Sequence, residues 1–170
     1  MGPSELKAAQ AGLKERYRAD PKSAIITLEA TGKIDDPAGL SCSVQTGRAL
    51  VKAGLHPATG GDGSLVCSGD MLLQALVACA GVTLRAVATS TGIAVHSGTI
   101  TAQGDLDFRG TLGVDREAPV GFCAIRLSFD LQTEADAGQL ATLQKLTERY
   151  CVVFQTIHKG TQISSTFAAV

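Results

Sequence analysis

The sequence predicts an α+β fold, with antiparallel sheets and a buried central helix. Two observations support this prediction. Segments that alternate apolar and polar residues occur in two pairs, and a long apolar helix pattern separates the pairs. Further helix patterns stand near the start of the chain and after the second pair. The expected order is α, β, β, α, β, β, α, β, which is typical of α+β proteins.

The first elements are a helix and two strands. Ser4 can cap a helix over residues 4–18, and Asp20-Pro21 ends it. Apolar residues alternate with polar ones over residues 26–31 and again over 40–45, which predicts an antiparallel pair with a long connection. A glycine-rich loop is expected over residues 54–69.

The central helix is predicted over residues 69–91. Ser68 can cap it, Asp70 suits its positive end, and Gly92 can stop it. This helix is apolar almost all round, so we expect it to be buried on most sides, against a sheet or under a second subunit.

Two strands, a helix and a last strand complete the pattern. In the first of these strands, one face is expected to carry Ile100, Ala102, Leu106 and Phe108. In the second strand, one face is expected to carry Cys123, Ile125, Leu127, Phe129 and Leu131. The helix covers about 135–150, with Leu140, Leu143, Leu146 or Thr147, and Tyr150 facing inward. The apolar segment 152–154 and a strand over 162–167 follow.

Composition limits the functions that the chain can have. Its 170 residues are 45% hydrophobic and 18% charged, which indicates a globular chain. We expect an extra helix over residues 1–20 and a single domain over 21–170. A net charge of −1 and 4% aromatic residues argue against nucleic acid or an anionic membrane as a partner. The apolar stretch 71–80 is too short to span a bilayer and no signal peptide is evident, so a cytoplasmic location is expected.

Five cysteines are the candidate chemical groups, and their spacing fits no zinc site. Cys79, in the central helix, is either a buried structural residue or a nucleophile that needs a nearby cation to form a thiolate. Cys151 stands where one helix ends or another begins, so a helix dipole could favour its thiolate. Cys42 and Cys123 are assigned to packing, whereas Cys67 is either a loop cysteine or an alternative resolving thiol.

Two cysteine motifs resemble those of the OsmC/Ohr family. Residues 72–79, LLQALVAC, resemble the family's ELLLAALASC helix, and residues 148–151, ERYC, resemble its E-K-Y-C-P-V element. The order of the cysteines and the surrounding strand pairs also match. The resemblance extends from about Ala24 to the C-terminus.

This resemblance implies an intertwined homodimer with two active sites at its interface. It also implies a peroxidase in which Cys79 attacks a hydroperoxide and becomes a sulfenic acid, and Cys151 resolves it to a disulfide. No bound cofactor or metal is implied. A lipoyl-type dithiol would be the external reductant.

The resemblance also points to a thiol-activating pair, Arg48 and Asp70. The family's T-G-G-R-D-G hairpin corresponds to Thr46-Gly47-Arg48-Ala49, and its helix-start carboxylate to Asp70. A solvated arginine and a simple helix-start charge are the alternatives. The proline that follows the family's second cysteine is replaced here by Val152.

The resulting prediction is a thiol-dependent peroxidase that reduces organic hydroperoxides in oxidative-stress defence. One alternative is a non-catalytic protein of the same fold that binds a small molecule in an apolar interface pocket. A second alternative is a thiol-transfer or thiol-protection protein that acts on small electrophiles. A cation near Cys79 would favour the peroxidase, and a thiol that faces only Leu and Val would favour binding.

Overall fold

The computed structural model describes residues 32–33, 41–46, 49–113 and 115–169, together with Ser4 and Ala19, and it describes the side chains of the long segments from Leu50 onward. The helix predicted over 4–18 and the strand predicted over 26–31 therefore fall outside this range, apart from Ser4. Two compact units make up the chain: residues 1–74 with 101–128, and residues 75–100 with 129–170.

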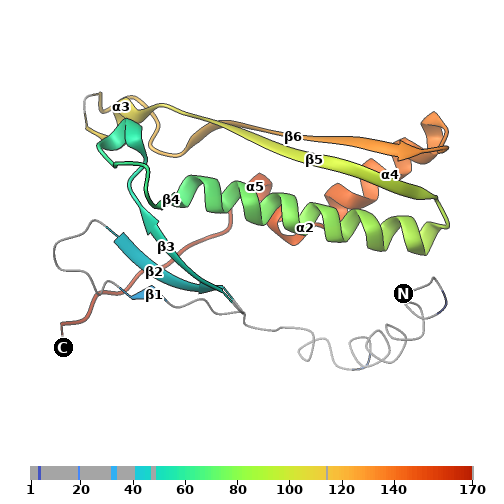
Figure 1. Cartoon of the computed structure of the whole chain (residues 1–170), viewed down its shortest axis with the longest axis horizontal. Coiled ribbons are helices and arrows are strands. Elements are labelled where there is room, and N and C mark those ends of the chain that lie inside the picture. Colours follow the sequence, from blue (N-terminus) through green and yellow to red (C-terminus); the bar gives the residue numbers. More distant parts are fainter. Residues whose placement is uncertain are drawn as a thin grey trace. The chain divides into compact units, whose positions relative to one another are not determined.

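The first unit contains a four-stranded sheet (Figure 1). Its strands, in the order β1-β2-β3-β4, are β1 (Gly32–Lys33), β2 (Ser41–Thr46), β3 (Ala49–Gly54) and β4 (Val66–Cys67). β2 pairs antiparallel with both β1 and β3, whereas β3 and β4 are parallel. The strand predicted over 40–45 is confirmed as β2. Thr46 pairs with Ala49, so β2 and β3 form a hairpin where the family resemblance implied one, although Gly47 and Arg48 themselves lie outside the described residues. The pairing predicted between residues 26–31 and 40–45 is not tested.

A long hairpin of β5 (Val95–Leu106) and β6 (Phe122–Thr133) forms a second sheet. Ser97 donates to Gln132 at 2.7 Å, and Arg126 pairs with Asp105 further along, so the strands run antiparallel. The predicted alternation is confirmed from Ile100 to Leu106 and from Ile125 to Leu131.

The predicted inward position of Cys123 is wrong, because this residue is exposed and Phe122 is half-buried instead. The ring of Phe122 occupies the space beside Gly104, where an added Cβ would come within 2.4 Å of the ring. The missing side chain of a glycine on β5 therefore shifts the inward face of β6 by one residue.

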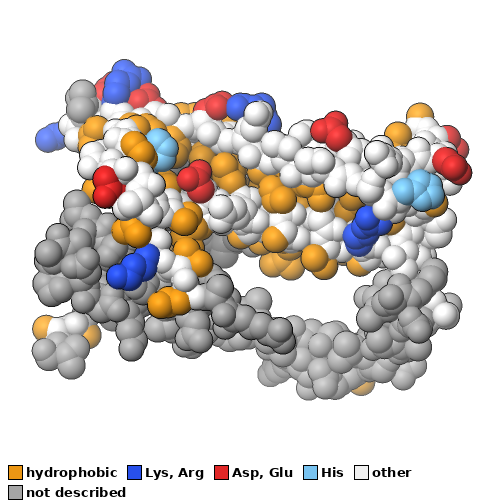
Figure 2. Space-filling model, in the orientation of Figure 1, with side chains coloured by type: hydrophobic (Ala, Val, Ile, Leu, Met, Phe, Trp, Pro, Cys, Tyr) orange, Lys and Arg blue, Asp and Glu red, His pale blue; other side chains and the backbone are white. Residues whose placement is uncertain are grey.

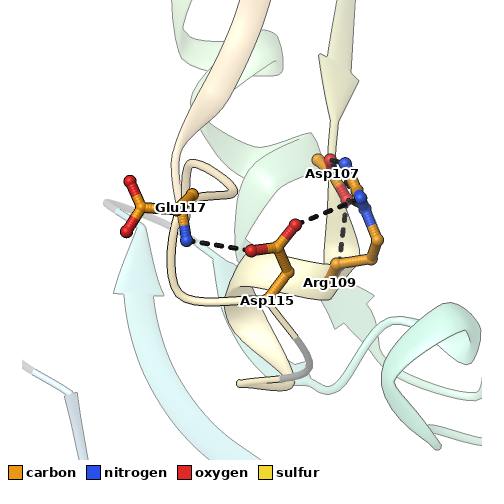
Figure 3. A network of polar contacts seen from close by, with 4 residues as sticks. All are labelled: Asp107, Arg109, Asp115 and Glu117. Carbon is orange, nitrogen blue, oxygen red and sulfur yellow. Dashed lines mark hydrogen bonds and ion pairs between the residues drawn. The ribbon is translucent and has the colours of Figure 1, made fainter.

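The β5–β6 connection carries a polar network (Figure 3). Asp107 caps the short helix α3 (Phe108–Thr111), and its carboxylate pairs with Arg109 at 2.6 Å. Arg109 also reaches Asp115 at 3.2 Å, and Asp115 accepts the N–H of Glu117 at 3.0 Å. These groups are largely exposed, so we assign the network to shaping the loop rather than to stability.

The central helix α2 (Ser68–Thr91) confirms the predicted bounds within one residue. It ends at Gly92, whose φ of 70° is left-handed, and the N–H of Ile93 returns to the carbonyl of Ala88 at 3.1 Å. This is the glycine stop that the sequence predicted.

The core of the second unit lies where the C-terminal half of α2 meets α4 (Ala137–Tyr150) and the base of the hairpin (Figure 1). Its buried residues are Leu84, Val87, Ala88, Ile93 and Leu143. The predicted helix over 135–150 is thus confirmed, and Leu143 and Thr147 are buried as predicted. However, Leu140 and Tyr150 are 40% and 64% exposed, so their predicted inward positions are wrong.

The single chain does not bury α2 on most sides, and burial under a second subunit is not tested by it. Only 28% of its most apolar window is buried, and Val82 is 74% exposed. Figure 2 shows hydrophobic side chains gathered over this helix. By length and composition alone α2 could cross a membrane, but this is weak evidence because core helices of water-soluble proteins meet the same criterion.

The end of the chain differs from the prediction in two respects. The apolar segment 152–154 begins a helix, α5 (Val152–Lys159). The strand predicted over 162–167 is not formed, and its apolar residues Ile163 and Phe167 are almost fully exposed. An alternation of apolar and polar residues makes a segment able to form a strand, but the strand forms only where a partner strand is available to pair with it.

Candidate active site

The second unit brings Cys79 and Cys151 together. Cys79 lies in the middle of α2 and is partly exposed. Cys151 stands between α4 and α5 and is only 1% exposed. Both are free cysteines, and each influences the pKa of the other, so the two thiols are neighbours.

Cys151 is placed by a sharp change of helix direction. It ends α4, where its N–H donates to the carbonyl of Thr147 at 2.9 Å, and it also caps α5. Its backbone is extended, with φ −72° and ψ 110°. The first intrahelical bond of α5 runs from the N–H of Gln155 to the carbonyl of Cys151 at 2.9 Å. The N–H groups before Gln155 are therefore free for other acceptors.

Those free N–H groups affect the ionisation of the two thiols. Burial raises the pKa of the Cys79 thiol, but hydrogen bonding from the N–H of Val153, the thiol of Cys151, the N–H of Val152 and the hydroxyl of Thr83 outweighs burial and brings the pKa below its ordinary value. Cys79 is therefore the thiol that ionises first.

Cys151 is shifted in the opposite direction. Burial raises the pKa of the Cys151 thiol, and the adjacent Cys79 raises it further, while the N–H groups of Phe154 and Val153 oppose the change only in part. The helix terminus favours the Cys151 thiolate as expected, through the N–H groups of Phe154 and Val153, but burial and the adjacent Cys79 outweigh that effect.

The described structure does not test the other predicted site residues against this pair. Asp70 is exposed in the first turn of α2, within the first unit. Arg48 lies outside the described residues, as does the side chain of Cys42. Cys67 is half-buried at the end of β4 and belongs to the first unit.

Sequence reasoning missed the groups that surround the Cys79 sulfur within the described range. Thr83 follows Cys79 by four residues on one helix, so its spacing could have revealed the contact. The N–H groups of Val152 and Val153 have no side-chain signature. Only the position of α5, which begins directly after Cys151, could have indicated them.

Comparisons with known proteins give the family. The family model described as OsmC-like protein matches residues 61–166. No curated protein matches the sequence.

Solved structures give the fold. An OsmC-like protein from Mycoplasma pneumoniae is 14% identical, with 79% of this chain and 89% of that chain covered and a TM-score of 0.65. An organic hydroperoxide resistance protein, OsmC, from Legionella pneumophila is 15% identical, with 78% and 90% covered and a TM-score of 0.55. OhrB, the organic hydroperoxide resistance protein of Bacillus subtilis, is 19% identical, with 79% and 93% covered and a TM-score of 0.52. At these identities the likeness to solved structures concerns the α+β fold alone. The family match, in contrast, spans most of the chain and includes both Cys79 and Cys151. The chain therefore belongs to the OsmC-like family.

Proposed function

We propose that this protein is a thiol-dependent peroxidase that reduces organic hydroperoxides. The observation that carries the proposal is the pairing of two thiols with opposite pKa shifts, Cys79 lowered and Cys151 raised. A peroxidase of this type needs one thiolate to attack and one protected thiol to resolve. Family membership supports the same reading, since some structural neighbours are organic hydroperoxide resistance proteins.

The cycle has three balanced steps. The Cys79 thiolate attacks the terminal, hydrogen-bearing oxygen of the hydroperoxide, the O–O bond breaks, and the alkoxide takes a proton to leave as an alcohol, so that Cys79 becomes a sulfenic acid. The Cys151 sulfur then attacks the Cys79 sulfur, and the hydroxyl of the sulfenic acid leaves with the Cys151 proton as water. Thiol–disulfide exchange with an external dithiol restores both thiols and oxidises the dithiol.

The test combines peroxide with intact-mass analysis. Reduced protein is mixed rapidly with cumene hydroperoxide and quenched. We expect the loss of two thiols and a disulfide that maps to Cys79 and Cys151. Cys79→Ser should abolish peroxide consumption, and Cys151→Ser should stop at one oxidation. Cys123→Ser is the matched control, because Cys123 is more exposed than either thiol of the pair and should be dispensable.

Thiols that stay reduced over minutes would overturn the peroxidase proposal. Equal loss of Cys123 and Cys79 would also contradict it, because oxidation would then follow exposure rather than activation. A raised Cys79 pKa would favour the alternative of a non-catalytic small-molecule-binding protein, whereas the lowered pKa of Cys79 favours the peroxidase.

The family resemblance adds two residues, Arg48 and Asp70, and an external reductant to this proposal. Arg48 would stabilise the thiolate and the departing oxygen, and Asp70 would orient Arg48. A lipoyl-type dithiol would be the reductant, and the reaction would take place in the cytoplasm without a bound cofactor. Arg48→Ala should slow peroxide consumption with the Cys79–Cys151 disulfide still formed.

We also propose that the protein acts as a homodimer. The support is the exposed apolar surface of α2, above all Val82, together with the exposed Ile163 and Phe167. Leaving this surface in water is unfavourable, and a second copy would cover it. Sedimentation equilibrium should give twice the chain mass. Val82→Glu should give the monomer mass, whereas Gln74→Glu, an exposed polar position on the same helix, should not. A monomeric wild type would refute the proposal.

A further inference from the structure

The corner between α4 and α5 carries the second cysteine of the pair. α4 ends at Tyr150 and α5 begins at Val152, with only Cys151 between them. Cys151 has an extended backbone, at φ −72° and ψ 110°, so the two helices do not continue into each other. The position of the Cys151 sulfur therefore depends on what fixes the two helices at this residue.

Gln155 bonds to both sides of this corner. Its backbone N–H donates to the carbonyl of Cys151 at 2.9 Å, which begins α5. Its side-chain Nε2 donates to the carbonyl of Glu148 at 2.7 Å, in the last turn of α4. In a continuous helix the N–H of residue 152 would donate to that carbonyl, but the extended Cys151 interrupts the helix. The side chain of Gln155 thus supplies a donor where the helix has lost one.

The bond between Gln155 and Glu148 lies on the inner side of the corner. Gln155 and Glu148 are half-buried, and Cys151 between them is only 1% exposed. A hydrogen bond that is partly withdrawn from water is stronger than an exposed one. The thiol of Cys151 makes no side-chain cap bond to α5, so it does not fix the corner itself. The side chain of Gln155 is therefore the described side-chain group that ties α5 back to α4 across Cys151.

We propose, on the basis of the peroxidase function above, that Gln155 is a positioning residue whose bond to the Glu148 carbonyl holds Cys151 where its sulfur can attack the oxidised Cys79. Such an attack needs the reacting atoms about 3–3.5 Å apart and aligned. A corner that swings freely spends less time in that geometry, so the loss of the bond should slow the attack. One typical hydrogen bond corresponds to a change of about fivefold.

Diamide separates the two steps without peroxide. The Cys79 thiolate adds to one nitrogen of its N=N bond and the other nitrogen takes a proton. The Cys151 sulfur then attacks the Cys79 sulfur, the S–N bond breaks, and the hydrazine leaves with the Cys151 proton, so that two thiols are oxidised and diamide is reduced. The rate of the first step rises with diamide concentration and that of the second does not. Acid-quenched samples analysed by intact mass therefore give both rate constants.

Gln155→Met removes the donor and keeps the length of the side chain. We expect unchanged addition of diamide to Cys79 and about fivefold slower attack by Cys151. Gln155→Lys should restore most of the second rate, because a lysine can donate to the last carbonyls of a helix. Gln144→Met is the matched control. It removes a bond of 2.9 Å to the side chain of the same Glu148, on the exposed surface of α4, and should change neither rate constant.

Equal second-step rates in the wild type and Gln155→Met would overturn the proposal. A faster second step would overturn it too, because the bond would then restrain Cys151 instead of placing it. Changes of the same size in both steps would point to a general disturbance of the fold and would also overturn it, as would a Gln155→Lys variant as slow as Gln155→Met. If Gln155→Met does not fold, Gln155→Glu decides the matter, because an ionised carboxylate keeps the length but has no N–H to donate.

The diamide reaction requires no peroxide, so its result stands apart from the proposed function. If Gln155→Met slows only the second step but cumene hydroperoxide leaves wild-type Cys79 reduced, Gln155 places Cys151 and the peroxidase proposal is wrong. If peroxide is consumed and the disulfide forms equally fast with and without the Gln155 donor, the peroxidase proposal survives and the positioning role is wrong.

Discussion

Leu143→Ala tests whether α4 packs on α2 as the structure shows. Leu143 is 1% exposed and lies in the cluster that includes Leu84, Val87 and Ala88 of α2. The substitution removes about three methylene equivalents, or roughly 2.4 kcal/mol of transfer free energy. A cavity in a packed core adds to this, so we expect the free energy of unfolding to fall by about 3 kcal/mol.

Urea denaturation followed by circular dichroism measures this loss. With a slope of about 2 kcal/mol per molar urea, the midpoint should fall by about 1.5 M. Leu140→Ala is the matched control on the same helix, because Leu140 is 40% exposed and its loss should cost under about 1 kcal/mol. Protein concentration is held constant, since a dimer's stability depends on it. Equal shifts for the two variants would refute the packing of α4 on α2.

Four other predictions concern the thiols and α4. Thr83→Val should raise the Cys79 pKa and slow its alkylation near pH 7, measured from a pH profile. Cys79→Ser should lower the Cys151 pKa, because a neutral hydroxyl replaces the adjacent thiolate. Thr147→Val should raise the unfolding free energy by about 1 kcal/mol, since the buried Thr147 hydroxyl has no hydrogen-bond partner within the described part of the chain. Asp136→Ala should lower it by about 1 kcal/mol, because Asp136 accepts from the N–H of Gln139 and completes a capping box; urea denaturation measures both.

The helices could be predicted from the sequence because their signals are local. Asp70 in the first turn and Gly92 at the end of α2 belong to the helix itself, and the structure has both where predicted. The sequence could not show in the same way which apolar residues a single chain buries from solvent. Val82 and Tyr150 fit the helical period but remain exposed, because coverage depends on elements that are distant in sequence or in another chain.

The candidate site also has features that could be predicted from the sequence and features that could not. The proximity of Cys79 and Cys151 followed from the family resemblance, because the side chains of these two cysteines define its two motifs. Two of the four groups that lower the Cys79 pKa are backbone N–H groups, which any residue except proline supplies, so no side-chain pattern could have revealed them.

One helix terminus influences the ionisation of both thiols. The N–H of Val153 lowers the pKa of Cys79 and of Cys151 alike, so whichever thiol ionises first draws the larger benefit from it. Cys79 is more exposed and has the lowered pKa, and its charge raises the pKa of Cys151. In the cycle that we propose, oxidation of Cys79 to a neutral sulfenic acid would remove that charge, and the N–H groups of Phe154 and Val153 would then favour a Cys151 thiolate. On that proposal the product of the first step would activate the resolving thiol, which would be protected from peroxide until then.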